Sequence, residues 1–440
     1  MRAFTSLAIE RKIAAAFFGL ICGGTLLLLL FNYYYNPLKL IDAFFTATSA
    51  VCVTGLIVVD TGTDLSPASQ MIVLLLIQLG GIGVMTAATT FSLILGERIG
   101  LRQRMLFAGG FGMDTPSGVI KFLIKILLFT LILEAVGAIP LFIGFLKAGL
   151  TPFKAFCSAI FHSISAFCNA GFSLFSNNLE GFSQSFIVSG TIMVLIVIGG
   201  LGFPVLTELS AIRKRNGNRL SLHSKLVLTT TLILILFGLF LFTISEWNTA
   251  FAHLPGGWKI WNGLFASITP RTAGFDTVAP STFSSAGLFV LVLLMIVGAS
   301  PGSTGGGFKT TTLAILVLSA WNTLRRRPDV VLWSRRIPFR ILQRTIAVSV
   351  LYLSGLGLGI LTLSIIEPLP FRELLFEAAS ALGTVGLSLG ITAQLSTGGK
   401  IVLILLMFWG RVGILTFIFG LLKGEFRGNV SYPDADIPIG

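Results

Sequence analysis

Four short backbone turns contain the residues of this chain whose types and spacing could do chemistry. Each turn is a run of small and hydroxyl residues that follows a Phe and ends at a glycine, and the glycines are Gly55, Gly171, Gly274 and Gly386. Fourfold recurrence of one pattern indicates four equivalent segments around an axis. Glycine permits positive-φ conformations that turn carbonyl groups inward, and carbonyl oxygens can replace the water shell of a cation. The turns therefore predict a cation site built from main-chain oxygens.

The predicted site takes four residues from each turn. Only the last copy, Gly383-Thr384-Val385-Gly386, is close to the Thr-Val-Gly core of potassium-channel filters. We therefore expect approximate fourfold symmetry and weaker discrimination between K+ and Na+. The other candidate residues are Cys52, Val53, Thr54 and Gly55, then Cys168, Asn169, Ala170 and Gly171, then Arg271, Thr272, Ala273 and Gly274.

A segment rich in Gly, Ser and Pro, residues 298–307, interrupts an apolar stretch. Because this composition disfavours a helix, we expect a flexible intramembrane loop below the turns that acts as a gate; a static helix break is the alternative. Phe308 separates Gly307 from Lys309, so the segment does not match a phosphate-binding loop, and we expect no organic cofactor in this chain. The candidate gate residues are Gly298, Ser300, Gly302, Ser303, Thr304, Gly305, Gly306, Gly307, Lys309 and Arg411.

Two arginines fall in unusual places. Arg411 sits in the middle of the last apolar stretch, where a charge is costly and usually faces a cavity or a partner. It could form an electrostatic barrier to cations or pair with carbonyl groups of the turns or the loop, and both readings stay open. Arg271 lies three residues before Gly274, and we expect its side chain to point away from the site and brace the turn.

Charged residues elsewhere give little support for enzyme chemistry. Asp60, Asp64, Glu180 and Asp276 flank the turns and could concentrate cations there, although solvated loop charge is the simpler reading. We find no nucleophile–base pair and no carboxylate pair within the apolar stretches. The four cysteines lack metal-binding spacing.

The composition is that of a polytopic membrane protein. Of the 440 residues, 54% are hydrophobic and 11% are charged, and the mean hydropathy is +0.91. We expect an all-α protein with eight transmembrane helices and four re-entrant pore helices, arranged as four parallel span–pore–span repeats around one pore. The expected spans are 13–31, 71–95, 122–146, 186–207, 226–245, 286–319 (interrupted), 346–366 and 401–422. The expected pore helices are 38–50, 151–166, 258–268 and 370–381, and the repeats are 1–104, 105–220, 221–328 and 329–440.

The formal net charge of +13 has a location that explains it. Most Lys and Arg residues fall in loops on one side, which the positive-inside rule makes cytoplasmic. Both termini are expected on that side. Nucleic-acid binding is a weak alternative, because each Arg cluster lies at the end of a span.

The turns at Gly55 and Gly274, the break at 298–307 and Arg411 resemble the Trk/Ktr/HKT superfamily of potassium transporters over nearly the whole chain. The short start before the first span resembles the bacterial Ktr membrane subunits. The resemblance implies a homodimer in the bacterial plasma (inner) membrane, K+ uptake coupled to or activated by Na+, and a cytosolic ring of RCK subunits that bind ATP/ADP or NAD(H). An alternating-access transporter of another small solute is the alternative, and it would predict inverted repeats.

Overall fold

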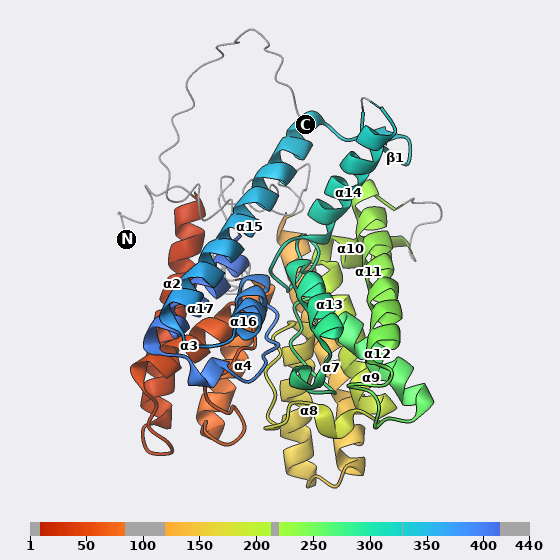
Figure 1. Cartoon of the computed structure of the whole chain (residues 1–440). Coiled ribbons are helices and arrows are strands. Elements are labelled where there is room, and N and C mark those ends of the chain that lie inside the picture. The colour runs from red at the N-terminus through yellow and green to blue at the C-terminus, as the bar shows by residue number, and fades with distance from the viewer. Residues whose placement is uncertain (1–8, 84–118, 213–219, 328, 414–440) are drawn as a thin grey trace.

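The structure, a computed structural model, describes residues 9–83, 119–212, 220–327 and 329–413. These residues are almost entirely helical, and the strands among them are β1 (Val331–Leu332) and β2 (Arg335–Arg336), which form a small antiparallel hairpin. One order of elements occurs four times: a long helix, a short helix, a glycine turn and a second helix (Figure 1). The long helices are α2 (Ile9–Asn32), α7 (Val119–Lys147), α11 (Leu222–Glu246) and α15 (Phe339–Ile366).

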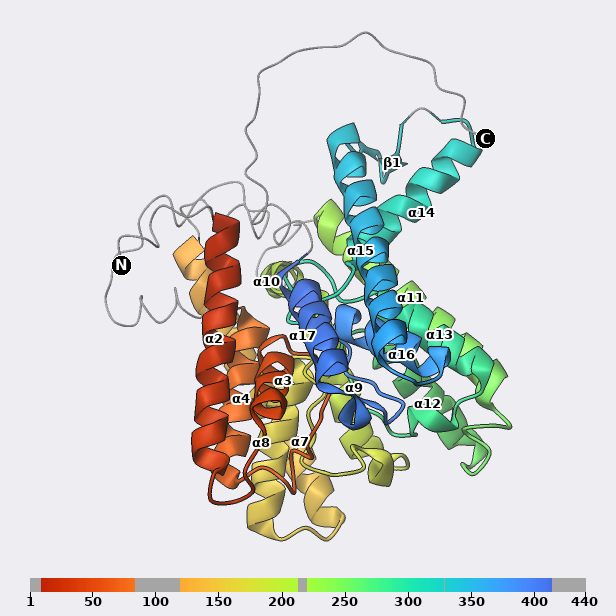
Figure 2. The same ribbon diagram turned by 60° about the vertical axis from the view of Figure 1, so that its left-hand side comes forward.

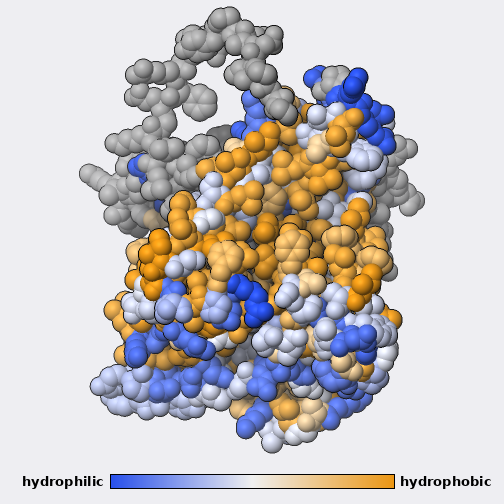
Figure 3. All heavy atoms as spheres, viewed as in Figure 1, coloured by the Kyte–Doolittle hydropathy of each residue, from blue (hydrophilic) through white to orange (hydrophobic). Residues whose placement is uncertain are grey.

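The long helices are the membrane-crossing candidates. Among the described residues these four are long and apolar enough to span a bilayer, and a fifth span results if one bent pair of helices is counted as one. Their outward faces are apolar, as Leu26 at 68% and Ile365 at 76% exposure illustrate. Figure 3 shows an apolar belt around the middle of this face, with hydrophilic residues toward both ends. Such a belt is suited to lipid and not to water.

The four short helices lie where the pattern predicts pore helices. They are α3 (Leu40–Val51), α8 (Pro152–Phe167), α12 (Gly256–Ile268) and α16 (Phe371–Gly383). Pro152 opens α8, and prolines precede α12 and α16 at the N-cap, where a missing N–H costs nothing. Each helix buries its last turns, where small residues and hydroxyls concentrate, so these ends lie inside the protein.

The second helices end or break at equivalent points. They are α4 (Pro67–Ile82), α9 (Phe186–Leu201), α13 (Ser285–Ile296) and α17 (Thr397–Val412). Gly83, Gly202 and Gly413 follow three of them with φ of 91°, 95° and 91°, conformations that end a helix. After Gly202 the chain resumes as α10 (Phe203–Ile212), and the two helices are bent by 96°, so 186–207 is not one continuous helix. The later parts of the expected spans 71–95 and 401–422 lie outside the described residues.

Glycines in the second helices allow close contact with the short helices. A Cβ on Gly80 would lie 2.1 Å from the carbonyl oxygen of Val51. The same contact would be 2.0 Å at Gly199, with Phe167, and 2.1 Å at Gly410, with Leu382. Small residues therefore let the second helices pack directly against the backbone of the short helices.

The third copy differs, as the sequence predicts. Between α13 and α14 (Thr310–Leu324) the chain is not helical, and a single parallel bridge joins Val297 to Phe308. The interruption of the sixth span is therefore confirmed, and its contacts are described below.

The four copies close on themselves. The second helix of each copy contacts the short helix of the next: α4 with α8, α9 with α12, α13 with α16, and α17 with α3. Figure 2 shows α17 beside α3. At this junction the ammonium of Lys400 lies 2.7 Å from the carboxylate of Asp42, and both side chains are largely buried. The ion pair joins the end of the described chain to its beginning.

Candidate cation pathway

The four turn glycines meet in a closed ring. At each of them a side chain would collide with the carbonyl oxygen of the next turn, which identifies the neighbour. The distances from a Cβ would be 2.4 Å from Gly55 to Ala170, 2.7 Å from Gly171 to Ala273, 2.4 Å from Gly274 to Val385, and 2.1 Å from Gly386 to Thr54. The neighbours follow chain order and return to the first turn. Main chain from four distant segments is therefore gathered at one narrow place.

Each turn alternates its backbone conformation in the same way. The final glycine has φ between 70° and 95° in all four turns. The residue two places earlier also has positive φ: Val53 at 56°, Asn169 at 58°, Thr272 at 72° and Thr384 at 50°. Left-handed residues at these two positions give all four turns the same backbone shape. For residues with a side chain this conformation costs about 1–2 kcal/mol each. Strain of this kind concentrates at functional sites, and the sequence pattern predicts it only at the glycines.

Hydroxyl groups at the ends of the short helices hold the turns. The amide N–H of Gly55 donates to Ser49 Oγ at 3.1 Å, and that of Gly386 donates to Ser380 Oγ at 3.0 Å. In the second turn Ser165 Oγ donates to the carbonyl of Phe172 at 2.8 Å, and Thr269 makes the equivalent bond to Phe275 in the third. The recurrent Ser and Thr of the pattern are thus structural supports.

A second recurring pair braces the chain just after two of the turns. His162 lies nine residues before Gly171 and its Nε2 is 3.0 Å from Ser173 Oγ. Glu377 occupies the same position before Gly386 and accepts a hydrogen bond from Ser388. Both ring nitrogens of His162 therefore have a polar partner, because Nδ1 also lies 2.7 Å from the carbonyl oxygen of Ser158. The predictions from the sequence do not include this bond of Glu377. Its position nine residues before the glycine, which matches that of His162, is the signal that points to it.

The short helices make the ring suitable for a positive charge. All four end at the turns, so their C-terminal carbonyl groups point toward the ring. A helix C-terminus carries about half a negative elementary charge. Main-chain oxygens and four helix ends together favour a cation and disfavour an anion.

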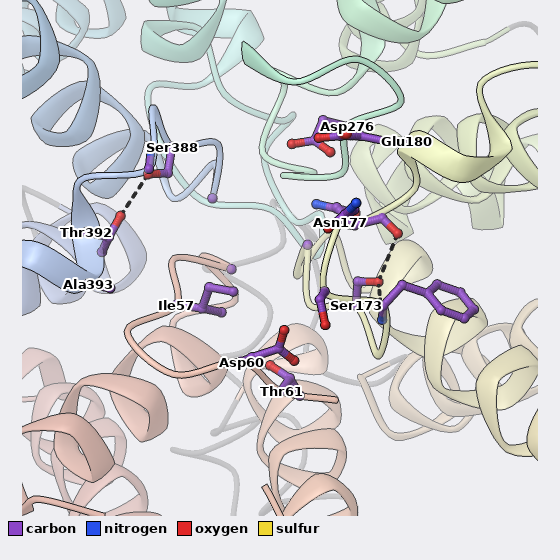
Figure 4. Close-up of a pocket in the computed structure, with 17 residues that line it drawn as sticks. Ile57, Asp60, Thr61, Ser173, Asn177, Glu180, Asp276, Ser388, Thr392 and Ala393 are labelled. Atoms are coloured by element: carbon purple, nitrogen blue, oxygen red, sulfur yellow. Dashed lines mark hydrogen bonds between the residues drawn. The ribbon is translucent and has the colours of Figure 1, made fainter. Parts of the chain in front are cut away.

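A cavity opens on one side of the ring. It has a volume of about 280 Å³, and Gly55, Gly171 and Gly386 are among the residues that line it (Figure 4). The cavity is also lined by three of the four acidic residues that flank the turns in the sequence, namely Asp60, Glu180 and Asp276. Asp64 does not; it accepts the N–H of Asp60 at 2.8 Å and shapes that loop. We call this space the outer cavity.

The segment between α13 and α14 lies against the turns below the outer cavity. The N–H of Gly306 donates to Thr384 Oγ1 at 3.2 Å, and Thr304 Oγ1 donates to the carbonyl of Phe167 at 3.0 Å. A Cβ on Gly305 would lie 2.1 Å from Thr272 Oγ1. The loop is therefore in contact with the second, third and fourth turns.

The same loop caps helix ends. Ser300 N–H donates to the carbonyl of Gly200 at 3.1 Å, and Gly307 N–H donates to that of Gly410 at 3.3 Å. The last carbonyls of a helix have no partner within it. The breaks after α9 and α17 therefore create acceptors that the loop satisfies.

Two basic side chains hold the loop carbonyls. Arg411 donates to the carbonyls of Thr304 and Gly80, and to that of Gly81 at 3.3 Å. The ammonium of Lys309 donates to the carbonyls of Gly305 at 2.9 Å and Gly306 at 3.2 Å. Arg411 thus has the carbonyl partners that one reading of the sequence expects; a barrier role remains a prediction.

Arg271 does not enter the ring. Its Nη2 donates to Thr231 Oγ1 on α11 at 3.3 Å, and only 6% of the residue is exposed. The side chain therefore points away from the turn and braces it against a long helix.

Comparison with known proteins gives consistent matches over nearly the whole chain. Residues 8–423 match the family model described as TrkH, cation transport protein. The chain is 40% identical to Ktr system potassium uptake protein B of Bacillus subtilis, over 97% of this chain and 96% of that protein. It is 37% identical to potassium/sodium uptake protein NtpJ of Enterococcus hirae, over 97% and 96%. The crystal structure of the potassium transporter TrkH from Vibrio parahaemolyticus has the same fold, with a TM-score of 0.74 and 21% identity over 94% of this chain and 84% of that chain.

Proposed function

This chain belongs to the TrkH family of cation transport proteins, and we propose that it is the ion-conducting membrane subunit of a bacterial potassium uptake system. The family is one of transporters and not of enzymes, as the lack of a predicted catalytic pair led us to expect. The names of the relatives, which include potassium and potassium/sodium uptake proteins, support K+ as the transported ion and leave a role for Na+.

The four glycine turns would act as the selectivity filter. The observation that carries this proposal is the closed contact of Gly55, Gly171, Gly274 and Gly386, with two left-handed residues in every turn. A dehydrated cation at the centre would exchange water for carbonyl oxygens. The hydroxyl supports and the buried short helices keep those oxygens in place before the ion arrives, which lowers the cost of binding.

The loop 298–307 would act as the gate, together with Lys309 and Arg411. Its contacts with three turns support a position directly below the filter. For an ion to pass, the loop must move out of the pathway. Its hydrogen bonds to the carbonyls of Gly200 and Gly410 must then break. Two tethered positive charges beside the pathway would also repel a passing cation, so removing one should raise flux.

The finer architecture belongs to the same proposal. We propose eight spans and four pore helices in parallel repeats at 1–104, 105–220, 221–328 and 329–440, with both termini cytoplasmic in the plasma membrane. The chain would form a homodimer. Because the relative from Bacillus subtilis is named as part of a Ktr system, we further propose a cytosolic regulatory ring of RCK type that binds ATP/ADP or NAD(H), with Na+ as coupling or activating ion.

Reconstituted flux tests this function. Purified protein in proteoliposomes should take up Rb+ or K+ down a gradient, and reversal potentials in opposed K+ and Na+ gradients should show preference for K+. Deleting about residues 301–307 should raise basal flux and weaken dependence on the partner ring. Absence of cation flux with and without the partner would reject a cation pathway and favour a carrier for another solute.

A further inference from the structure

Two side-chain oxygens beside the third glycine turn are buried and have no hydrogen-bond partner. They are Oδ1 of Asp276 and Oδ1 of Asn178, and both residues line the outer cavity. Burying an unpaired neutral acceptor costs about 1–3 kcal/mol, and a charged one costs more. Two unpaired oxygens at one polar cavity are suited to a positively charged ligand.

The position of both oxygens is fixed by the backbone around them. Asn178 Nδ2 donates to the carbonyl of Gly274 at 3.2 Å, and the N–H of Leu179 donates to the carbonyl of Asp276 at 3.0 Å. Since the carbonyl of Gly274 needs a donor, the first bond also determines which end of the Asn178 amide is its oxygen. That carbonyl belongs to Gly274, the last residue of the third turn. It is already engaged, and the side chains of Asn178 and Asp276 present oxygens beside it.

Charge at this place also favours a cation. Figure 4 shows the carboxylate of Asp276 beside Glu180, at the edge of the outer cavity, and Asp60 lies across that cavity. Two neighbouring carboxylates repel each other, and a cation held at one of them relieves the repulsion. Among the described residues no group of three His, Cys, Asp or Glu side chains gathers as a metal site would. The arrangement therefore suits a monovalent alkali cation better than a divalent one.

We propose that Asp276 and Asn178 form a binding site for one K+ or Na+ ion at the outer mouth, which supplies the filter. The site would be distinct from the filter because its ligands are side chains of the loops that follow the second and third turns. This inference rests on the proposed function, since it assigns the site to the same pathway.

Protons should compete with the cation at this site. Burial, with a further contribution from Glu180, raises the pKa of Asp276 to about 8. Below that pH the carboxyl group is neutral and binds a cation poorly; above it the carboxylate is available. Apparent affinity should therefore increase as pH rises through this range, by about tenfold between pH 7 and pH 9 if only the ionised fraction binds.

Few other titratable groups near the site could contribute to this pH dependence. The titratable residues that line the outer cavity are Asp60, Glu180 and Asp276. A neighbouring cavity is lined by Glu180 and His253. Neither cavity is lined by a described Lys or Arg. Asp276 should dominate above neutral pH, because burial lifts its pKa into that range.

The test is the external Rb+ concentration that gives half-maximal uptake into proteoliposomes, measured at about pH 7 and about pH 9. In the unchanged protein it should fall about tenfold with rising pH. Asp276→Asn should raise it at pH 9 and abolish the pH dependence, while maximal uptake persists. Glu180→Gln should shift the transition to lower pH, because it removes the repulsion that keeps Asp276 protonated. Glu373→Gln is the matched control: this carboxylate is in the first turn of α16, does not line the cavity, and should change nothing.

A binding readout separates this site from conduction. At pH 9, RbCl should raise the thermal unfolding midpoint of the unchanged protein above that in choline chloride, and less so for Asp276→Asn. Repeating it with NaCl identifies the preferred ion. Wild-type half-saturation and pH dependence in a folded Asp276→Asn variant would overturn the proposal. If Asp276→Asn does not fold, an unchanged pH dependence of half-maximal Rb+ uptake in Glu180→Gln would overturn the proposal. Lack of Rb+ flux in the unchanged protein, with the midpoint shift intact, would reject the proposed function and leave the site.

Discussion

Replacing Gly386 with serine should damage ion selection more than any comparable change outside the ring. This glycine has φ of 95°, and a Cβ on it would lie 2.1 Å from the carbonyl oxygen of Thr54 and 3.0 Å from Cα of Gly55. Both are backbone atoms, so no side chain can rotate away. The first turn must shift, and the shift moves oxygens that would contact the ion.

Two contributions make up the free-energy cost of Gly386→Ser. The left-handed conformation costs a residue with a side chain about 1–2 kcal/mol, and the collision adds about 1–3 kcal/mol of the kind seen on overpacking a core. Gly149→Ser is the matched control, because Gly149 has φ of 89° and nothing within 4 Å of its Cβ position. Gly149→Ser should therefore lose only the stability that the left-handed conformation costs, and it should leave the K+ over Na+ selectivity unchanged. The second contribution, if borne by the filter, reduces the preference for K+ over Na+ by about tenfold per 1.4 kcal/mol.

Reversal potentials in opposed K+ and Na+ gradients measure that preference, and thermal unfolding measures the stability of both variants. The four ring positions also have a predicted order. Gly386, with the shortest contact, should be most sensitive, and Gly171, with 2.7 Å, least. Equal selectivity in Gly386→Ser and Gly149→Ser, with both proteins folded, would refute the reasoning that the ring discriminates between ions.

Three further changes probe the supports of the pathway. Arg411→Ala removes the donor to three carbonyls and a positive charge, so basal Rb+ flux in proteoliposomes should increase. Ser380→Ala leaves the amide of Gly386 without its acceptor; stability should fall by about 1 kcal/mol in thermal unfolding, with more Na+ leak. Lys400→Met leaves the buried carboxylate of Asp42 without its ion-pair partner at the junction of the last and first copies. This change should destabilise the protein by on the order of 3 kcal/mol.

Each of these has a contrary outcome. Loss of folding without higher flux in Arg411→Ala would leave this residue a structural role only. Wild-type selectivity in Ser380→Ala would mean that the fourth turn keeps its shape without the hydroxyl. Joint replacement of Lys400 and Asp42 by apolar residues should recover most of the stability lost in Lys400→Met, and failure to do so would show that the loss comes from packing.

The sequence by itself determined the local features. The turns at Gly55, Gly171, Gly274 and Gly386, the short helices before them and the break near 298–307 each follow from backbone preferences of consecutive residues. Apolar stretches of sufficient length mark the long helices, since a bilayer requires internal hydrogen bonding over about 20 residues. Signals of this kind act over one or two helical turns and can be read from one segment.

Tertiary structure alone decided which of these segments meet. Arg411 bonds to Gly80, 331 residues away along the chain, and no local pattern encodes that pairing. The bend at Gly202 and the left-handed conformation of Thr384 depend on the packed neighbours that outweigh their cost. Asn178 reaches the third turn only because the folded chain brings the loops after the second and third turns into contact. Contacts between distant segments are set by how whole helices pack, and that packing is a property of the assembled chain.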